Sequence, residues 1–254
     1  MSTCFNAELY EGRGQVYLAV RAANGTLGEW EPIAEARSLE IAITQDFEDV
    51  YSRCDRNSGL IAHILRQTDY EVTLETLDMS MASVAKAVYG AVASVTTASI
   101  TAEPVSFAGV GSVVSLAHPF KTTAIVLKQG ATTVDAGDYE ADEQGNITLL
   151  DVSALTGPAP YNLTVAYSHG DYDKVEAAVN GITNYALRFD GVSIAENRPV
   201  QVIMHNIALN MSSTLGFITE EVGTLTLTGK LLADRTKGAG KSQYLTIAKG
   251  KDLI

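Results

Sequence analysis

The stretch from Arg37 to Gly90 constrains the fold more than any other part of the chain. Residues 39–44 alternate apolar and polar side chains, as a half-buried β-strand does, and residues 70–77 repeat this alternation. More than twenty mostly polar residues, Gln45 to Gln67, lie between the two segments. Most connections in compact domains are much shorter. We therefore expect two strands joined by a long inter-strand loop.

This expected loop is too apolar to be a solvated linker. It carries six large apolar side chains, Phe47, Tyr51, Leu60, Ile61, Ile64 and Leu65. Side chains of this kind need a surface on which to bury their apolar area. If the domain cannot supply that surface, a neighbouring subunit must, and the pattern thus predicts a building block of a larger assembly.

Strand signals dominate the remainder of the chain, with alternating segments rich in Val, Ile, Thr and Tyr. The clearest expected strands are residues 16–21, 91–101, 113–116, 124–128, 147–150, 162–167, 174–179, 185–189, 200–209, 224–232 and 244–248. One helix is expected at Ser80–Tyr89, with Asp78 or Ser80 as its cap and Gly90 after its end. The predicted fold class is mainly β, with one short flanking helix.

Residues 103–170 differ from their surroundings. They contain four of the chain's six prolines, Pro104, Pro119, Pro158 and Pro160, and several turns marked by glycine. We expect an inserted small β subdomain at 103–170 within a main β domain formed by residues 1–102 and 171–254. The alternative is a set of extended hairpins continuous with the main domain.

Composition bounds the class of protein. A chain of 254 residues with 46% hydrophobic and 19% charged residues is typical of a globular protein. It has no apolar run of the roughly 18 residues expected of a membrane span, and the N-terminal sequence has no secretory signal, so no membrane partner is expected. Two cysteines, Cys4 and Cys54, are too few for a disulfide scaffold and are expected to remain reduced.

The net charge of −12 argues against a conventional DNA-binding protein, which needs clustered Lys and Arg to neutralise phosphates. Carboxylates on a surface instead repel phosphate. The simpler alternative is that the charge only keeps the protein soluble.

No catalytic, cofactor-binding or metal-binding residues can be nominated. The four histidines, His63, His118, His169 and His205, have no partner at metal-ligand spacing. The segment Gly238–Ser242 lacks the first glycine and the context of a phosphate-binding loop. Neighbouring acids such as Asp171 and Asp173 fit solvated turns better than a calcium or glycosidase site. The chain is not expected to be an enzyme.

Several segments, in this order and spacing, resemble the tail tube (major tail) proteins of bacteriophages with long non-contractile tails. They are Arg37–Ile41 (RSLEI), Asp55–Leu60 (DRNSGL), Val72–Leu77 (VTLETL), Ala85–Gly90 (AKAVYG), Tyr185–Gly191 (YALRFDG), Pro199–Ile203 (PVQVI) and Leu225–Asp234 (LTLTGKLLAD). The resemblance covers about two thirds of the chain and depends on all the segments together.

The resemblance implies a β-sandwich subunit that closes into hexameric rings, which stack head-to-tail into a hollow tube. Genomic DNA passes through the lumen without specific binding. The implied partners are other copies of the chain and other tail proteins at the tube ends. The implied location is the virion tail, assembled in the host cytoplasm.

Two sets of residues are predicted to serve assembly. The first is the loop between subunits, with apolar anchors and charged rims: Asp46, Phe47, Glu48, Asp49, Tyr51, Arg53, Asp55, Arg56, Leu60, Ile61 and Ile64. The second set, on the polar face of the two strands, is predicted to line the lumen: Glu40, Thr44, Glu71, Thr73 and Glu75.

A softer hypothesis pairs the acidic first half of the chain with its basic last 25 residues between successive rings, because head-to-tail contacts produce open polymers. The main alternative function is a β-sandwich adhesin or carbohydrate-binding module on a phage or cell surface. Such modules present exposed aromatic residues, and this chain has one tryptophan, Trp30.

Overall fold

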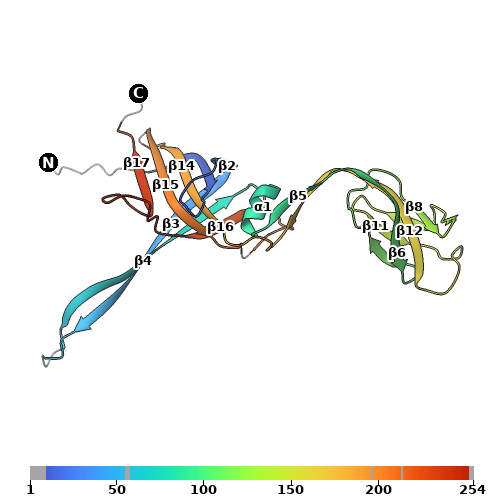
Figure 1. The fold of residues 1–254 in the computed structure, drawn as a ribbon, viewed down its shortest axis with the longest axis horizontal. Coiled ribbons are helices and arrows are strands. Elements are labelled where there is room, and N and C mark those ends of the chain that lie inside the picture. Colours follow the sequence, from blue (N-terminus) through green and yellow to red (C-terminus); the bar gives the residue numbers. More distant parts are fainter. Residues whose placement is uncertain (1–9, 55–57, 196, 213, 252–254) are drawn as a thin grey trace. The chain divides into compact units, whose positions relative to one another are not determined.

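A computed structural model describes residues 10–54, 58–195, 197–212 and 214–251. These parts contain seventeen strands and one α-helix, which confirms the predicted mainly-β class. The chain divides into two compact units. The first unit comprises residues up to Val92 together with Val175 onward, and the second comprises Ala93–Lys174 (Figure 1).

The first unit is built on one eight-stranded antiparallel sheet. The strand order is β2-β1-β14-β15-β16-β4-β3, and β17 pairs with β15. The strands are β2 (Glu31–Ile33), β1 (Gly12–Val20), β14 (Asn184–Ser193), β15 (Arg198–Leu209), β16 (Leu225–Leu231), β4 (Leu60–Thr76), β3 (Ala36–Tyr51) and β17 (Leu245–Lys249). Ile33 of β2 and Leu39 of β3, from opposite ends of this order, belong to the same core. The two layers expected of a sandwich are therefore one continuous sheet curled around its own core.

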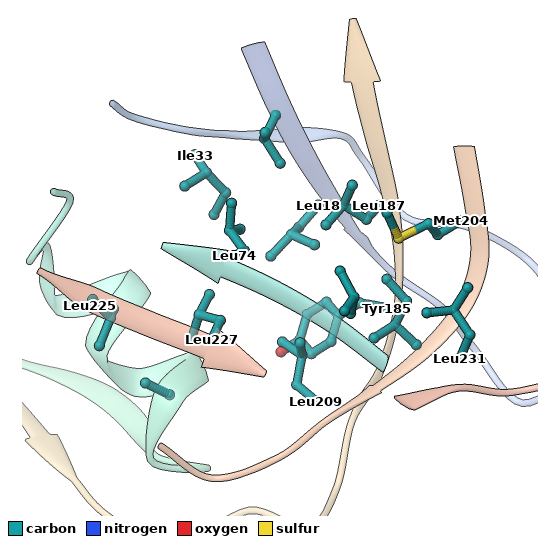
Figure 2. Packing of buried hydrophobic residues seen from close by; sticks show 14 of the residues in the cluster. Leu18, Ile33, Leu74, Tyr185, Leu187, Met204, Leu209, Leu225, Leu227 and Leu231 are labelled. Atoms are coloured by element: carbon teal, nitrogen blue, oxygen red, sulfur yellow. The ribbon is translucent and has the colours of Figure 1, made fainter. Parts of the chain in front are cut away.

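Side chains on the inner face of this sheet alternate with outward ones, as the strand repeat of two residues requires. Figure 2 shows Leu74 of β4 and Leu227 of β16 gathered with Leu18 of β1 and Leu187 of β14. All four side chains are at most 2% exposed. Because these strands are distant in sequence, packing of their inner faces is what closes the fold.

Helix α1 (Met81–Ala87) lies within the predicted range. Ser80 caps it by accepting a hydrogen bond from the Ser83 amide. Burial alone would raise the pKa of Asp78, but hydrogen bonds from Ser83 and Ser80 outweigh burial and lower it. At the other end Tyr89, rather than the predicted Gly90, has the positive φ of 51°. Gly90 is needed for space instead, since a Cβ there would lie 2.7 Å from Val175 Cγ1.

The prediction of a long loop between the two strands is wrong. Residues 45–51 and 60–67 continue β3 and β4 as one long antiparallel hairpin, which extends beyond the other strands of its unit (Figure 1). The pairing shifts register between Asp46 and Phe47 and again between Val50 and Tyr51. Polar residues dominate this hairpin because much of its surface is exposed, so the half-buried alternation that signals a strand is absent.

The second unit has two sheets. The four-stranded sheet has the order β6 (Ala98–Phe107), β12 (Tyr161–His169), β8 (Val126–Gln129) and β9 (Thr132–Thr133), and the three-stranded sheet has the order β10 (Tyr139–Ala141), β11 (Asn146–Leu149) and β7 (Val113–Ser115). Phe107, Leu127 and Ile147, from both sheets, are fully buried in one core. Residue 103, where the sequence places the start of an inserted subdomain, lies inside β6.

The single strand expected at 91–101 is two strands. β5 (Ala91–Val95) pairs with β13 (Tyr172–Glu176), and β6 starts at Ala98 beside β12. The break falls at Thr97, whose amide donates to the Asp171 carboxylate and whose hydroxyl donates to the His169 carbonyl, 2.6 Å away. These side-chain hydrogen bonds replace ladder bonds and allow the chain to change sheets.

Candidate assembly surfaces

The outer part of the β3–β4 hairpin, residues 43–51 and 60–67, exposes an unusual amount of apolar surface. Eight large apolar side chains in it are between 37% and 66% exposed: Ile43, Phe47, Val50, Tyr51, Leu60, Ile61, Ile64 and Leu65. The predicted interface residues among them are thus brought together on one element. Soluble monomers rarely expose contiguous apolar area on this scale, except at binding surfaces.

One face of the hairpin continues the inner face of the sheet. Leu39 and Ile41 pack against the core, and the same row of β3 runs on through Ile43, Phe47 and Tyr51. On β4, Leu65 lies opposite Phe47 and Leu60 lies opposite Tyr51. We call this row the apolar stripe, and define it as Ile43, Phe47, Tyr51, Leu60 and Leu65.

Polar contacts hold the hairpin side chains in place between the apolar ones. The ring of Phe47 stacks on His63 at 4.2 Å between centroids, and His63 Nδ1 lies 2.5 Å from the Asp49 carboxylate. Arg66 forms an ion pair with Glu48. Of the other predicted interface residues, Asp46 and Arg53 are exposed, and Asp55 and Arg56 lie outside the described residues.

The predicted lumen residues lie on the opposite face of the same strands. Glu40 is directly opposite Thr73, and Thr44 is opposite Asp69. Glu71 and Glu75 belong to the same row of β4, because they differ from Thr73 by two residues. The register therefore brings all five predicted residues onto one exposed or half-buried face of the sheet.

Three further residues of this face were missed from the sequence. Asp69 extends the acidic row of β4, and the alternation at 69, 71, 73 and 75 could have indicated it. Thr228 and Lys230 of β16 lie opposite Thr73 and Glu71, which no sequence spacing could show. We define the acidic face as Glu40, Asp69, Glu71 and Glu75, together with the threonines between them. Arg37, 3.7 Å from Glu75, and Lys230 balance part of its charge.

The titratable side chains elsewhere in the described parts of the chain were compared with the requirements of a metal site. No group of three His, Cys, Asp or Glu side chains within them could hold a metal ion. In the second unit, His118 and His169 stack at 4.3 Å with nearly parallel rings, so their lone pairs do not converge on one point. Burial and the hydrogen bond donated to Glu103 raise the pKa of Tyr167 to about 12, as expected of a structural hydroxyl.

Among the described residues, none of the helical segments has the length and apolar character to span a membrane.

The fold and these surfaces define an antiparallel β-protein with a long projecting hairpin, apolar along one face and acidic at the base of the other. The chain belongs to the family described as Protein of unknown function UCP028589, whose sequence model matches residues 9–248. The match covers nearly all of both units. No match was found among curated proteins.

Proposed function

We propose that this protein is a structural subunit of a bacteriophage tail tube. Copies close into hexameric rings, the rings stack head-to-tail, and genomic DNA passes through the hollow interior during ejection into the host. The observation that carries the proposal is the β3–β4 hairpin, which places eight exposed large apolar side chains on an element projecting beyond the body of its unit.

Such a hairpin fits an interface better than any role in an isolated chain. Residues 45–51 extend over roughly 23 Å at about 3.3 Å per residue, far enough to lie along a neighbouring subunit. Interface cores combine aromatic and aliphatic anchors with a charged rim, and Phe47, Tyr51 and the pair Glu48–Arg66 match that composition. Burying the apolar stripe removes its area from water at about 25 cal/mol per Å².

The acidic face suits the wall of a DNA conduit. Its carboxylates are ranged along β3 and β4, and six copies in a ring would repeat them around the lumen. Repulsion between carboxylate and phosphate keeps DNA from adhering to the wall, which a passage needs. In this proposal the chain is no enzyme and needs no cofactor, metal or membrane. It works in the virion tail after assembly in the host cytoplasm, with other tail proteins at the tube ends.

Concentrated wild-type protein should form long hollow tubes or six-fold rings. The physical reason is that the exposed apolar stripe leaves water, which lowers the free energy, only when another copy covers it. Negative-stain electron microscopy and size-exclusion chromatography over a concentration series make the measurement. A protein that remains monomeric throughout and binds glycans instead would replace this proposal with the adhesin alternative.

Reversing charge on the acidic face should impair DNA passage without impairing the tube. In the double variant Glu71→Lys and Glu75→Lys, lysines at two positions per copy would attract phosphate and slow ejection at least tenfold. Ejection is measured by DNA release from purified virions carrying the variant, and tube length by electron microscopy. The matched control is Glu140→Lys with Glu143→Lys, two exposed acids of the second unit. Wild-type ejection by the first variant would remove the conduit role of this face.

A further inference from the structure

The first unit contains an open groove at one end of its curled sheet. Strands β1, β3, β14, β15 and β17 line it, and it encloses about 920 Å³. Its apolar wall includes Val16, Leu39, Ile41, Phe189, Val202 and Ile247. Ile247 is 63% exposed, and Leu39, Ile41, Phe189 and Val202 are only partly buried at the margin of the core. Among the described residues of this unit, none covers this part of the core.

Glycines explain why the groove is hollow. The inner row of β1 continues from Val16 to Gly14 and Gly12, which have no side chains to fill the space. Gly14 lies directly opposite Gly191 of β14. A Cβ at Gly14 would collide with the backbone of Asp190 and Gly191, so the two strands approach closely here. The floor is backbone at Gly14, whereas the Tyr10 ring lies over Gly12 and the Phe189 ring lies over Gly191.

The groove cannot be filled by the hairpin of its own chain. Leu39 and Ile41 form part of its wall, and β3 runs on from them as an extended strand, away from the groove, to Tyr51 (Figure 1). The hairpin of another copy has no such restriction. It presents the same kind of surface, an apolar row on a strand pair, and it needs the same kind of cover.

Charges at the groove agree with this occupant. Three cations, Arg13, Arg37 and Lys249, line the groove against one carboxylate, Glu40. The guanidinium side chains of Arg13 and Arg37 are 78% and 62% exposed, and their partners Glu11 and Glu75 lie at 3.6 and 3.7 Å. In residues 43–51 and 60–67 of the hairpin, three acids, Asp46, Glu48 and Asp49, outnumber the one arginine, Arg66. Opposite net charge on the two surfaces favours their association.

We infer that the groove of one copy receives the β3–β4 hairpin of a second copy, with the apolar stripe against Ile41, Phe189 and Ile247. The inference rests on the proposed function and adds to it the surface that accepts the hairpin. Donor and acceptor surfaces are different parts of the chain, so the contact is heterologous and repeats without closing into a dimer. Each added copy buries one hairpin and offers another.

A single substitution in the groove tests this assignment. Ile247→Asp places a charge against the stripe, and the exposed position should tolerate it without unfolding. We expect the concentration needed for polymerisation to rise at least tenfold, measured by light scattering and electron microscopy, while the melting temperature of the monomer stays near the wild-type value. The matched control is Ile182→Asp, also in the first unit, 68% exposed and outside the groove, which should polymerise like wild type.

Cross-linking gives an independent measurement. Cys54 is exposed at the end of the hairpin. One preparation carries Cys4→Ser and keeps Cys54, and the other carries Cys4→Ser, Cys54→Ser and Arg13→Cys. A hairpin lying in the groove of another copy brings the two cysteines together, so a short bis-maleimide reagent should yield from the mixture a cross-linked dimer that neither preparation yields alone.

The outcomes separate this inference from the proposed function. Polymers of wild type, their loss in Ile247→Asp but not in Ile182→Asp, and the cross-linked dimer support both. Polymers that persist in Ile247→Asp, polymers lost equally in both variants, or polymers without the cross-link overturn the groove as the receptor and leave the tube proposal standing. A wild-type chain that stays monomeric overturns both.

Discussion

A chain shortened at the hairpin should remain a monomer at concentrations where the wild type forms tubes or rings. The shortened variant replaces residues 47–66 by Asn-Gly, so that Asp46 and Gln67, which lie opposite each other in the sheet, are joined by a two-residue turn. The replacement removes all large apolar side chains of the stripe except Ile43. It keeps the part of β3 and β4 that packs against the core.

The physical reason for this expectation is that the removed segment supports little of the fold. Leu39, Ile41, Val72 and Leu74 carry the core contacts of the two strands, and none of them is removed. The monomer should therefore melt within a few degrees of the wild type, as followed by circular dichroism. Size-exclusion chromatography and electron microscopy should show loss of every assembled species.

Substitutions within the full-length hairpin separate the effect of apolar burial on assembly from the effect of hairpin length. Phe47→Ser with Leu65→Ser removes two stripe residues that lie opposite each other and should also abolish assembly. Gln45→Ser with Thr68→Ser replaces two polar residues of the same hairpin that also lie opposite each other. Neither belongs to the apolar stripe or carries a charge, so this control should still assemble. Assembly of the shortened chain at wild-type concentrations would disprove the role given to the hairpin.

Replacing Asp234 by alanine should cost the first unit about 3 kcal/mol of unfolding free energy. Asp234 and Arg21 form an ion pair at 2.7 Å, and their side chains are only 6% and 8% exposed. Asp234 also accepts hydrogen bonds from the amide and hydroxyl of Thr236. Removing one partner leaves a buried guanidinium without compensation, which costs about 3–5 kcal/mol in buried pairs. We take the lower value because this site lies near the surface.

The pH dependence of this variant follows from the same contacts. Burial alone would raise the pKa of Asp234, but hydrogen bonds from Thr236 and the charge of Arg21 outweigh it and lower the pKa. A carboxyl with a lowered folded-state pKa stabilises the protein above its unfolded pKa of about 3.9. That contribution disappears as the pH falls through the folded value, so the difference between wild type and variant should shrink only below about pH 4.

Urea unfolding at pH 7 and at acid pH makes this measurement. The control is Glu11→Ala, which removes the exposed ion pair with Arg13 and should cost at most about 1 kcal/mol. Equal losses of unfolding free energy in Asp234→Ala and Glu11→Ala would show that the buried Arg21–Asp234 pair does not stabilise the fold. A difference between wild type and Asp234→Ala that persists undiminished at low pH would contradict the assigned lowering of the Asp234 pKa.

Part of the fold could be predicted from the sequence because it depends on contacts between residues close together in the chain. The helix at Met81–Ala87 was predictable because Ser80 caps it through a contact three residues away, and contacts so close in sequence leave a visible spacing. The inner face of β4 was predictable because Val72 and Leu74 are buried beside polar neighbours. The apolar residues of the hairpin could also be identified in the sequence, and the prediction of an assembly was based on their number.

Other features depended on contacts that no spacing reveals. Residues 45–67 were predicted as a loop, because strands exposed on both faces lack the alternation that burial produces. The break between β5 and β6 at Thr97 was missed because its cause is Asp171, more than seventy residues away. The addition of Lys230 to the acidic face depended on the pairing of β16 with β4.

The amino-acid sequence by itself therefore determined the mainly-β class, the helix and the set of residues that need a partner. Each of these follows from propensities and spacings within a few residues of the chain. Only the tertiary structure decided that the sheet is continuous and curled, that the apolar stripe prolongs its inner face, and that three glycines leave a groove open beside it. Those features arise from the pairing of distant strands, whose register is set by packing across the core.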